Sequence, residues 1–141
     1  MKNNMKVSFS AQNANVVFAR TIAMGFLVNL KINVSTLNEI KTAISEAVTN
    51  AIVHGYLSDA AKHVEMEMYY DSELIKIIVR DYGVGSEDIE KAKEPLFSTK
   101  ESEDRAGLGF TIMEVFMDEV KVTSVVGEKT EIEMIKKYHE S

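Results

Sequence analysis

The chain has 141 residues, the size of one ordinary domain, and its 22 acidic against 16 basic side chains give a formal net charge of −6. A negative balance of this size argues against a general affinity for nucleic acid or for an anionic membrane surface. The absence of cysteine excludes disulfides and thiolate metal sites. We therefore expect a single domain over residues 1–141 with no direct nucleic-acid partner.

The N-terminal segment lacks the features of a targeting signal. Residues 1–13, MKNNMKVSFSAQN, contain neither the continuous apolar stretch nor the cleavage site of a signal peptide. No segment approaches the roughly 20 apolar residues that a membrane-spanning helix needs. We expect a soluble, cytoplasmic protein without a membrane partner.

The first predicted elements are a short strand and two helices. Residues 6–11 have the character of a strand. Residues 13–30, NANVVFARTIAMGFLVNL, have helical spacing and a single charge, Arg20, which is unusual for a helix with a solvated side. We expect this helix to meet another protein surface. A capping box formed by Thr36 and Glu39 is expected to open a second helix, which ends near Gly55.

From residue 63 the hydrophobic period changes to that of strands. In HVEMEMYYD, residues 63–71, apolar and acidic residues alternate, which indicates a strand with one buried face. After a turn, LIKIIVRDYG at residues 74–83 predicts a central strand. SEDIEKA predicts a short helix capped by Ser86. Residues 94–107, EPLFSTKESEDRAG, predict a long polar loop.

The C-terminal third predicts one more helix and a hairpin. Residues 108–118, LGFTIMEVFMD, return to helical spacing, and residues 119–137 predict two strands joined by a turn at GEK. Strands are segregated from helices instead of alternating regularly with them. This organisation favours an α+β fold, a two-layer α/β sandwich with a mixed, mostly antiparallel sheet.

Three short motifs contain residue types suited to surround one ligand. Glu46, Asn50 and His54 are spaced four apart, which puts them on one face of the second predicted helix. DYGVG places Asp81 at the end of an apolar strand, before two glycines that permit close backbone approach. GLGF, at residues 107–110, precedes a predicted helix, where free N–H groups and the helix dipole favour an anion such as phosphate.

Each motif alone also has an ordinary structural explanation, because polar residues at helical spacing commonly form a solvated face and glycines commonly serve tight turns. Their order and spacing together are more specific. From about residue 39 to residue 132, EAVTNAIVH, DYGVG, a long polar loop and GLGF resemble the boxes of the GHKL superfamily of ATPases and kinases. Within it, ExxxNAxxHGY, PLFSTK and GLGFTIMExFMD are similar to the anti-sigma factor serine kinases, most of all those of endospore-forming bacteria.

The resemblance implies an ATP-binding sandwich of Bergerat type, with helices on one face of the sheet and with ATP or ADP and Mg²⁺ as cofactors. Asn50 would coordinate the Mg²⁺, for which an amide oxygen is a suitable ligand. Glu46 would be the general base toward the attacking hydroxyl. His54 is expected to be structural. Asp81 would accept a hydrogen bond from the adenine amine, supported by Thr130, although GEKT replaces a tighter GxGT in the last turn.

The remaining nucleotide contacts come from glycines and from a lid. Gly83 and Gly85 would let the backbone pass close to the base, and the loop at about 94–106 would be the ATP lid. The other candidate contacts, all to phosphate, are Ser98, Thr99, Lys100, Arg105, Gly107, Leu108 and Gly109.

The resemblance also implies the function and the partners. A member of this family binds and inhibits a sporulation sigma factor of the F type, and it phosphorylates a serine of a STAS-domain anti-anti-sigma factor. Residues 6–30 are the expected partner and homodimer surface, with the dimer built from Val16, Val17, Ile22, Ala23 and Phe26. Arg20 is our candidate for pairing with a partner carboxylate, and its alternative is an internal ion pair.

Two other functions stay open. One is the catalytic domain of a sensor histidine kinase, against which the chain shows no separate two-helix segment with a phospho-accepting histidine. The other is a non-catalytic, nucleotide-gated binding module. The presence of Glu46, the candidate base, argues against it.

Overall fold

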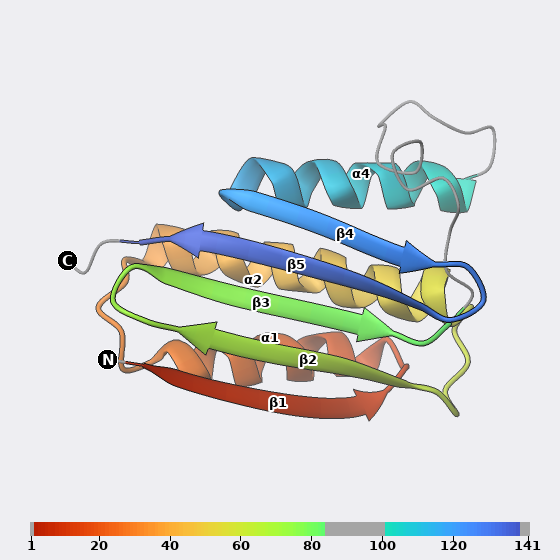
Figure 1. Cartoon of the computed structure of the whole chain (residues 1–141), viewed down its shortest axis with the longest axis horizontal. Helices are drawn as coiled ribbons and strands as arrows, with labels where there is room; N and C mark the ends of the chain where they lie inside the picture. The colour runs from red at the N-terminus through yellow and green to blue at the C-terminus, as the bar shows by residue number, and fades with distance from the viewer. Residues whose placement is uncertain (1, 84–100, 139–141) are drawn as a thin grey trace.

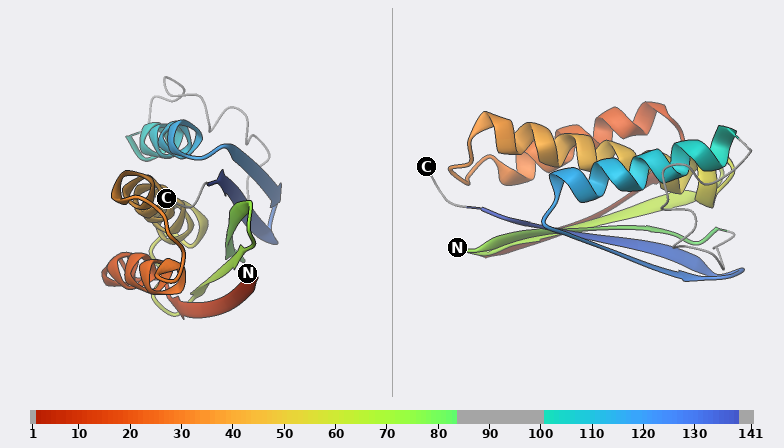
Figure 2. Two further views of the ribbon diagram at one scale, coloured as in Figure 1. Left: turned by 90° about the vertical axis from the view of Figure 1, so that its left-hand side faces the viewer. Right: turned by 90° about the horizontal axis from the view of Figure 1, so that it is seen from above.

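The computed structural model describes residues 2–83 and 101–138, and within 101–106 it describes only the backbone. Five strands form one sheet in the order β1-β2-β3-β5-β4, and the helices cover one face of it (Figures 1 and 2). The elements are β1 (Asn3–Ser10), α1 (Ala14–Leu27), α2 (Val34–Asn50), the π-helical turn η1 (Ala51–Gly55), β2 (His63–Tyr70), β3 (Leu74–Asp81), α4 (Glu101–Phe116), β4 (Glu119–Val125) and β5 (Lys129–Lys137). The predicted two-layer sandwich is confirmed. All four pairs of neighbouring strands are antiparallel, so the described sheet is not mixed.

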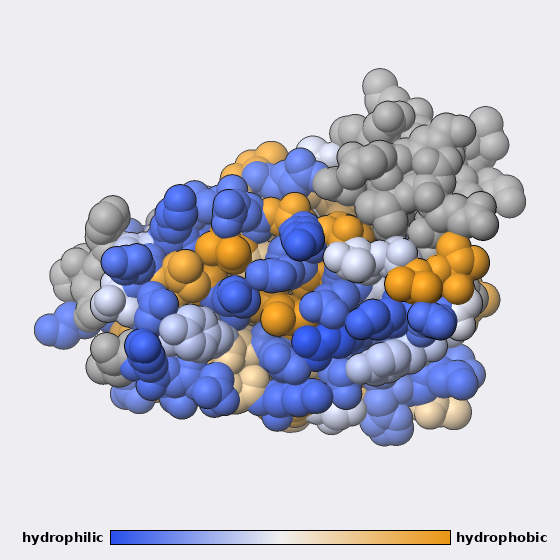
Figure 3. Space-filling view, viewed as in Figure 1, coloured by the Kyte–Doolittle hydropathy of each residue, from blue (hydrophilic) through white to orange (hydrophobic). Residues whose placement is uncertain are grey.

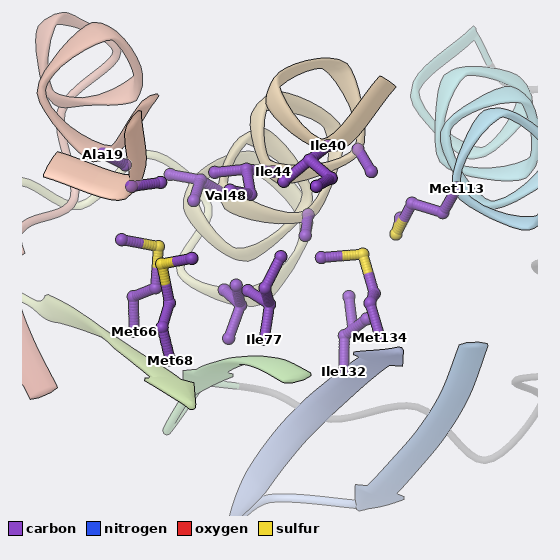
Figure 4. Close-up of a cluster of buried hydrophobic side chains, with 14 of the residues drawn as sticks. Ala19, Ile40, Ile44, Val48, Met66, Met68, Ile77, Met113, Ile132 and Met134 are labelled. Carbon is purple, nitrogen blue, oxygen red and sulfur yellow. The ribbon is translucent and has the colours of Figure 1, made fainter. Parts of the chain in front are cut away.

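The hydrophobic core fills the space between the sheet and the helices. Alternate residues of β2 and β3 are buried, as the two-residue period predicted. In Figure 4, Met66, Ile77 and Met134 point from three adjacent strands toward Ile44 and Val48 of α2. Each such side chain contributes about 1.5–3 kcal/mol when it is fully buried. This packing fixes α2, which carries the first predicted motif, over the centre of the sheet.

The opposite face of the sheet is solvated and charged. Arg80 on the central strand β3 pairs with Glu67 of β2 at 2.6 Å and with Glu131 of β5 at 3.1 Å. Opposite charges on adjacent strands stabilise the register of the sheet. Figure 3 views this face and shows hydrophilic side chains with separate hydrophobic ones between them. In the part of the chain that the structure describes, no helix has the length and apolar character needed to cross a membrane.

The start of α2 differs from the predicted capping box. Asn33 is the N-cap, with an extended backbone (ψ 159°), and its side chain accepts a hydrogen bond from the Thr36 N–H at 2.8 Å. An N-cap residue must stand just outside the helix, whereas Thr36 already lies in the first turn. Glu39 instead lies 3.6 Å from the ammonium group of Lys136. The box of Thr36 and Glu39 is therefore wrong.

The helix ends near Gly55, as predicted, but its last turn is π-helical. η1 is a wider turn in which the Tyr56 N–H bonds to the carbonyl of Ala51, five residues earlier. Two left-handed residues, Leu57 (φ 53°) and Ser58 (φ 60°), then stop the helix. The short helix expected after Ser86 lies outside the described residues.

Candidate active site

A pocket of about 280 Å³ lies between α2 with η1 on one side and α4 on the other. Its lining residues are Glu46, Thr49, Asn50, Val53, His54, Leu108, Gly109 and Ile112. Residues three and four apart share one helix face, so α2 and η1 present the predicted polar stripe to α4. The pocket thus brings together residues of the first and third motifs, at the lower end of the usual size for small-ligand sites.

Glu46 is the half-buried acid of this pocket. Burial raises the pKa of its carboxyl above the ordinary value of 4.5, because a low-dielectric environment disfavours the charged form. Gly109 lies directly against it, since a Cβ at that position would stand 3.1 Å from Glu46 Oε2. The glycine therefore lets α4 approach the acid closely. A carboxylate with a raised pKa is a stronger proton acceptor.

Asn50 follows one turn later and faces the same pocket. Its amide oxygen is a ligand type that Mg²⁺ accepts, and Mg²⁺ at nucleotide sites takes most of its other ligands from phosphates and water. The donor set therefore fits a nucleotide-bound Mg²⁺. Among the described residues there is no group of three His, Asp or Glu side chains placed to hold a metal. His54 also lines the pocket, and its structural role stays a prediction.

A second group of site residues, Asp81 with Thr130, lies at the end of β3. Asp81 is 3% exposed, and its carboxylate accepts a hydrogen bond from the Gly83 N–H at 3.1 Å. Burial raises its pKa to about 6, against the opposing effect of the Gly83 bond. Thr130 is its direct register partner on β5 and shares a hydrogen bond of 2.9 Å with Ser124. The two residues thus lie side by side in the sheet, and their contact with adenine stays a prediction.

The backbone packs tightly around this carboxylate. A side chain at Gly55 would overlap the Asp81 carboxyl group, and one at Gly83 would overlap the Gly55 carbonyl. Gly83 is thus packed closely against η1, and the predicted approach of its backbone to the base stays a prediction. Tyr56, which the sequence reasoning missed, donates its hydroxyl to the His63 carbonyl and accepts the N–H of the residue after Asp81, both at 2.7 Å. Its place at the end of ExxxNAxxHGY, two residues after His54, was the available signal.

The chain that has this geometry matches known proteins over almost its whole length. The family model of the histidine kinase-like ATPase domain matches residues 9–136. The anti-sigma F factor of Anoxybacillus flavithermus is 46% identical over 136 residues, which cover 96% of this chain and 93% of that protein. The chain belongs to the anti-sigma F factor family.

Other comparisons agree with this membership. The anti-sigma F factor of Clostridium perfringens is 44% identical over 137 residues, covering 97% of this chain and 98% of that protein. The RsbU and RsbW domains of Rv1364c from Mycobacterium tuberculosis superpose with a TM-score of 0.65 at 18% identity, covering 95% of this chain and 32% of that one. The second likeness shows a shared fold. The matched ATPase domain implies that the chain binds a nucleotide.

In this anti-sigma F family member, the GLGF motif lies inside α4 and not before it. GLGF was expected to precede a helix, but α4 begins at Glu101, so Gly107 lies more than one turn inside it. Glu, Arg and Ala are good helix formers and the segment ESEDRA has no proline, so the helix extends over part of the predicted loop. N–H groups inside a helix bond to carbonyls four residues earlier. The prediction that Gly107, Leu108 and Gly109 offer N–H groups at a helix start is therefore wrong for this structure.

Several predicted contacts lie outside the described part of the chain. These are Gly85, Ser98, Thr99, Lys100 and the side chain of Arg105. Leu108, which is 52% exposed, and Gly109 do line the pocket. Their relation to phosphate stays a prediction.

Arg20 is half-buried on α1 and donates to the Ser45 hydroxyl at 3.3 Å, next to Glu46. Within the described residues no carboxylate pairs with it at ion-pair distance, so the alternative of an internal ion pair finds no support there.

The predicted dimer surface is wrong at Ala23, which is fully buried in the core. Phe26 packs on the ring of Tyr70 at 5.0 Å. Helical spacing alone did not reveal which side of α1 faces the sheet.

Proposed function

We propose that this chain is an anti-sigma factor that binds a sporulation sigma factor and, as an ATP-dependent serine kinase, phosphorylates a STAS-domain anti-anti-sigma factor. The observation that carries the proposal is the pocket in which Glu46 and Asn50 lie one turn apart, in a chain 46% identical to an anti-sigma F factor. The cytoplasm, where sigma factors act, is the corresponding location. A homodimer that uses α1 belongs to the same proposal.

Glu46 is the general base of the proposed reaction. Its carboxylate takes the proton of the substrate serine while the serine oxygen attacks the terminal phosphorus of ATP. The bond from that phosphorus to the bridging oxygen breaks, and ADP leaves. Burial raises the pKa of Glu46 above its ordinary value, which makes its carboxylate a stronger proton acceptor for this transfer.

Asn50 would hold Mg²⁺, which neutralises phosphate charge when bound. Asp81 accepts the hydrogen bond of the adenine amine, and Thr130, its register partner, supports this contact. The two groups of residues lie on either side of η1, so one nucleotide would contact both. Positioning and charge neutralisation are the main requirements of phosphoryl transfer.

The test of the kinase uses ATP labelled on its terminal phosphate and a cognate STAS-domain protein. Glu46→Gln should keep Mg·ATP binding and lose serine phosphorylation by about 10²–10⁴-fold, the usual contribution of a general base. Glu39→Gln is the matched control, because Glu39 is on the same helix but pairs with Lys136 outside the pocket. Near-normal transfer by Glu46→Gln would remove it from the role of base.

The label also separates the other two functions. Label on a histidine would favour a histidine kinase, and bound ATP without any transfer would favour the nucleotide-gated binding module.

The test of the partner surface is Arg20→Glu. Charge reversal should abolish binding of the sigma factor or of the anti-anti-sigma factor and leave ATP affinity intact, because Arg20 does not line the pocket. Arg20→Lys should bind more weakly than wild type, since lysine lacks the planar fork for a carboxylate. Unchanged binding to both partners by Arg20→Glu would refute this role.

A further inference from the structure

The π-helical turn η1 contacts both groups of site residues. Val53 and His54 line the pocket that contains Glu46. The last residue of η1, Gly55, lies against the Asp81 carboxyl group. Single π turns inside helices occur frequently at functional sites. Here the turn is the segment that connects the two groups.

The hydroxyl of Tyr56 fixes the backbone that follows Asp81. Tyr56 is 7% exposed, and its hydroxyl accepts the Tyr82 N–H at 2.7 Å while donating to the His63 carbonyl at 2.7 Å. The next N–H, that of Gly83, bonds to the Asp81 carboxylate itself. The two peptide groups after Asp81 are therefore held by Tyr56 and by the carboxylate. Without the hydroxyl, the Tyr82 N–H would lose this partner, which would release the turn.

Gly55 fixes the space that the carboxylate occupies. A Cβ at this position would overlap the carboxyl carbon and both carboxyl oxygens of Asp81. The backbone on the other side gives no room either, because Gly83 packs against the Gly55 carbonyl. Any side chain at residue 55 therefore moves the carboxylate from its present position.

We propose that Gly55 and Tyr56 are positioning residues that set the preference of the site for adenine. They hold the Asp81 carboxylate and the backbone after it where an exocyclic amine of a purine donates its hydrogen bond. The inference rests on the proposed function, in which Asp81 contacts adenine. It separates the preference for adenine from the affinity for the rest of the nucleotide. The residues around Glu46 are on the other side of η1, and their contacts do not depend on the base.

The experiment compares the affinities of ATP and purine riboside triphosphate, which lacks the exocyclic amine. Gly55→Ala displaces the carboxylate and Tyr56→Phe releases the turn. Gly25→Ala is the matched glycine control, because a Cβ there meets nothing within 4 Å. Tyr69→Phe is the matched hydroxyl control, because its hydroxyl bonds to Asp71 at 3.0 Å, away from the site.

Wild type and both controls should prefer ATP by at least about tenfold, the usual value of a hydrogen bond to a charged group. Gly55→Ala and Tyr56→Phe should lose most of this preference while their affinity for the amine-free analogue changes by less than about threefold. Tyr56→Phe tests the inference even if Gly55→Ala fails to fold.

Two failures are distinguishable. If folded variants bind both nucleotides more weakly in parallel and keep the wild-type preference, Gly55 and Tyr56 have only a structural role and the inference is overturned. If wild type itself binds both nucleotides equally, the adenine contact of Asp81 in the proposed function is refuted and the inference falls with it.

Discussion

Asp81→Asn removes a charge that the fold buries at a cost. Among the described residues, Asp81 is the only acidic or basic side chain that is buried. Its pKa of about 6 in the folded protein lies above the ordinary value of 3.8, and desolvation is the largest cause. Asparagine keeps an oxygen that can accept the Gly83 N–H bond. The substitution should weaken ATP binding and at the same time stabilise the apo protein near neutral pH.

The size of the effect follows from the two pKa values. A raised pKa means that protonation of Asp81 stabilises the folded state fully below about pH 4, and that this contribution is lost as the pH rises through about 6. The difference of roughly two pKa units corresponds to about 3 kcal/mol at 1.36 kcal/mol per unit. About 1.4 kcal/mol of this falls between pH 5 and pH 7.5. The advantage of Asp81→Asn over wild type should grow by that amount over the same interval.

The assay is urea unfolding of wild type and Asp81→Asn without nucleotide, at equal protein concentration, at about pH 5 and pH 7.5. Other carboxylates titrate equally in both proteins, so the change in the difference between their unfolding free energies reports Asp81 alone. Asp71→Asn is the control. Two backbone N–H groups lower the pKa of the half-buried Asp71. The stability contribution of its ionised form is therefore lost only below about pH 4, and the effect of Asp71→Asn should not change between the two pH values.

A difference between wild type and Asp81→Asn that is independent of pH would refute the reasoning, because Asp81 would then titrate near its ordinary value. A difference that shrinks as the pH rises would refute it more strongly. Unchanged ATP affinity in Asp81→Asn would show that adenine binds elsewhere.

Two smaller changes test the local geometry of the helices. Gly109→Ala puts a Cβ 3.1 Å from Glu46 Oε2, so phosphoryl transfer should fall several-fold to about tenfold, while helix propensity raises the unfolding free energy by up to about 1 kcal/mol. Both are measured on the same preparation, and unchanged transfer would contradict the contact. Leu57→Gly should stabilise the protein by roughly 0.5–1 kcal/mol in thermal unfolding, because Leu57 has φ 53° and is 70% exposed. A lowered melting temperature would show that the leucine side chain has a packing role.

Local sequence patterns predicted most of the fold because burial is periodic. The alternation of β2 appears in the structure residue by residue, with Val64, Met66, Met68 and Tyr70 buried. Boundaries were harder to predict where two caps compete. Both Asn33 and Thr36 are residue types that cap helices, and only the extended backbone of Asn33 distinguishes them.

The candidate site was predictable where one helix carries it and not where distant segments meet. Glu46 and Asn50 share a face through helical spacing alone, so their common pocket follows from the sequence. The contact between Tyr56 and Tyr82 joins residues 26 positions apart. No local period encodes such a contact, because it depends on how η1 packs against the end of β3.

The exceptions to ordinary stability rules are concentrated around that contact. A buried carboxylate at Asp81, a glycine inside a helical turn at Gly55 and a left-handed leucine at Leu57 each cost free energy. All three lie at the end of η1 or against it. Chains retain such features mainly where function requires them. Their common location argues that this part of the fold is adapted to bind a ligand at the expense of stability. The two responses expected of Asp81→Asn, higher stability and weaker ATP binding, test this relation in one variant.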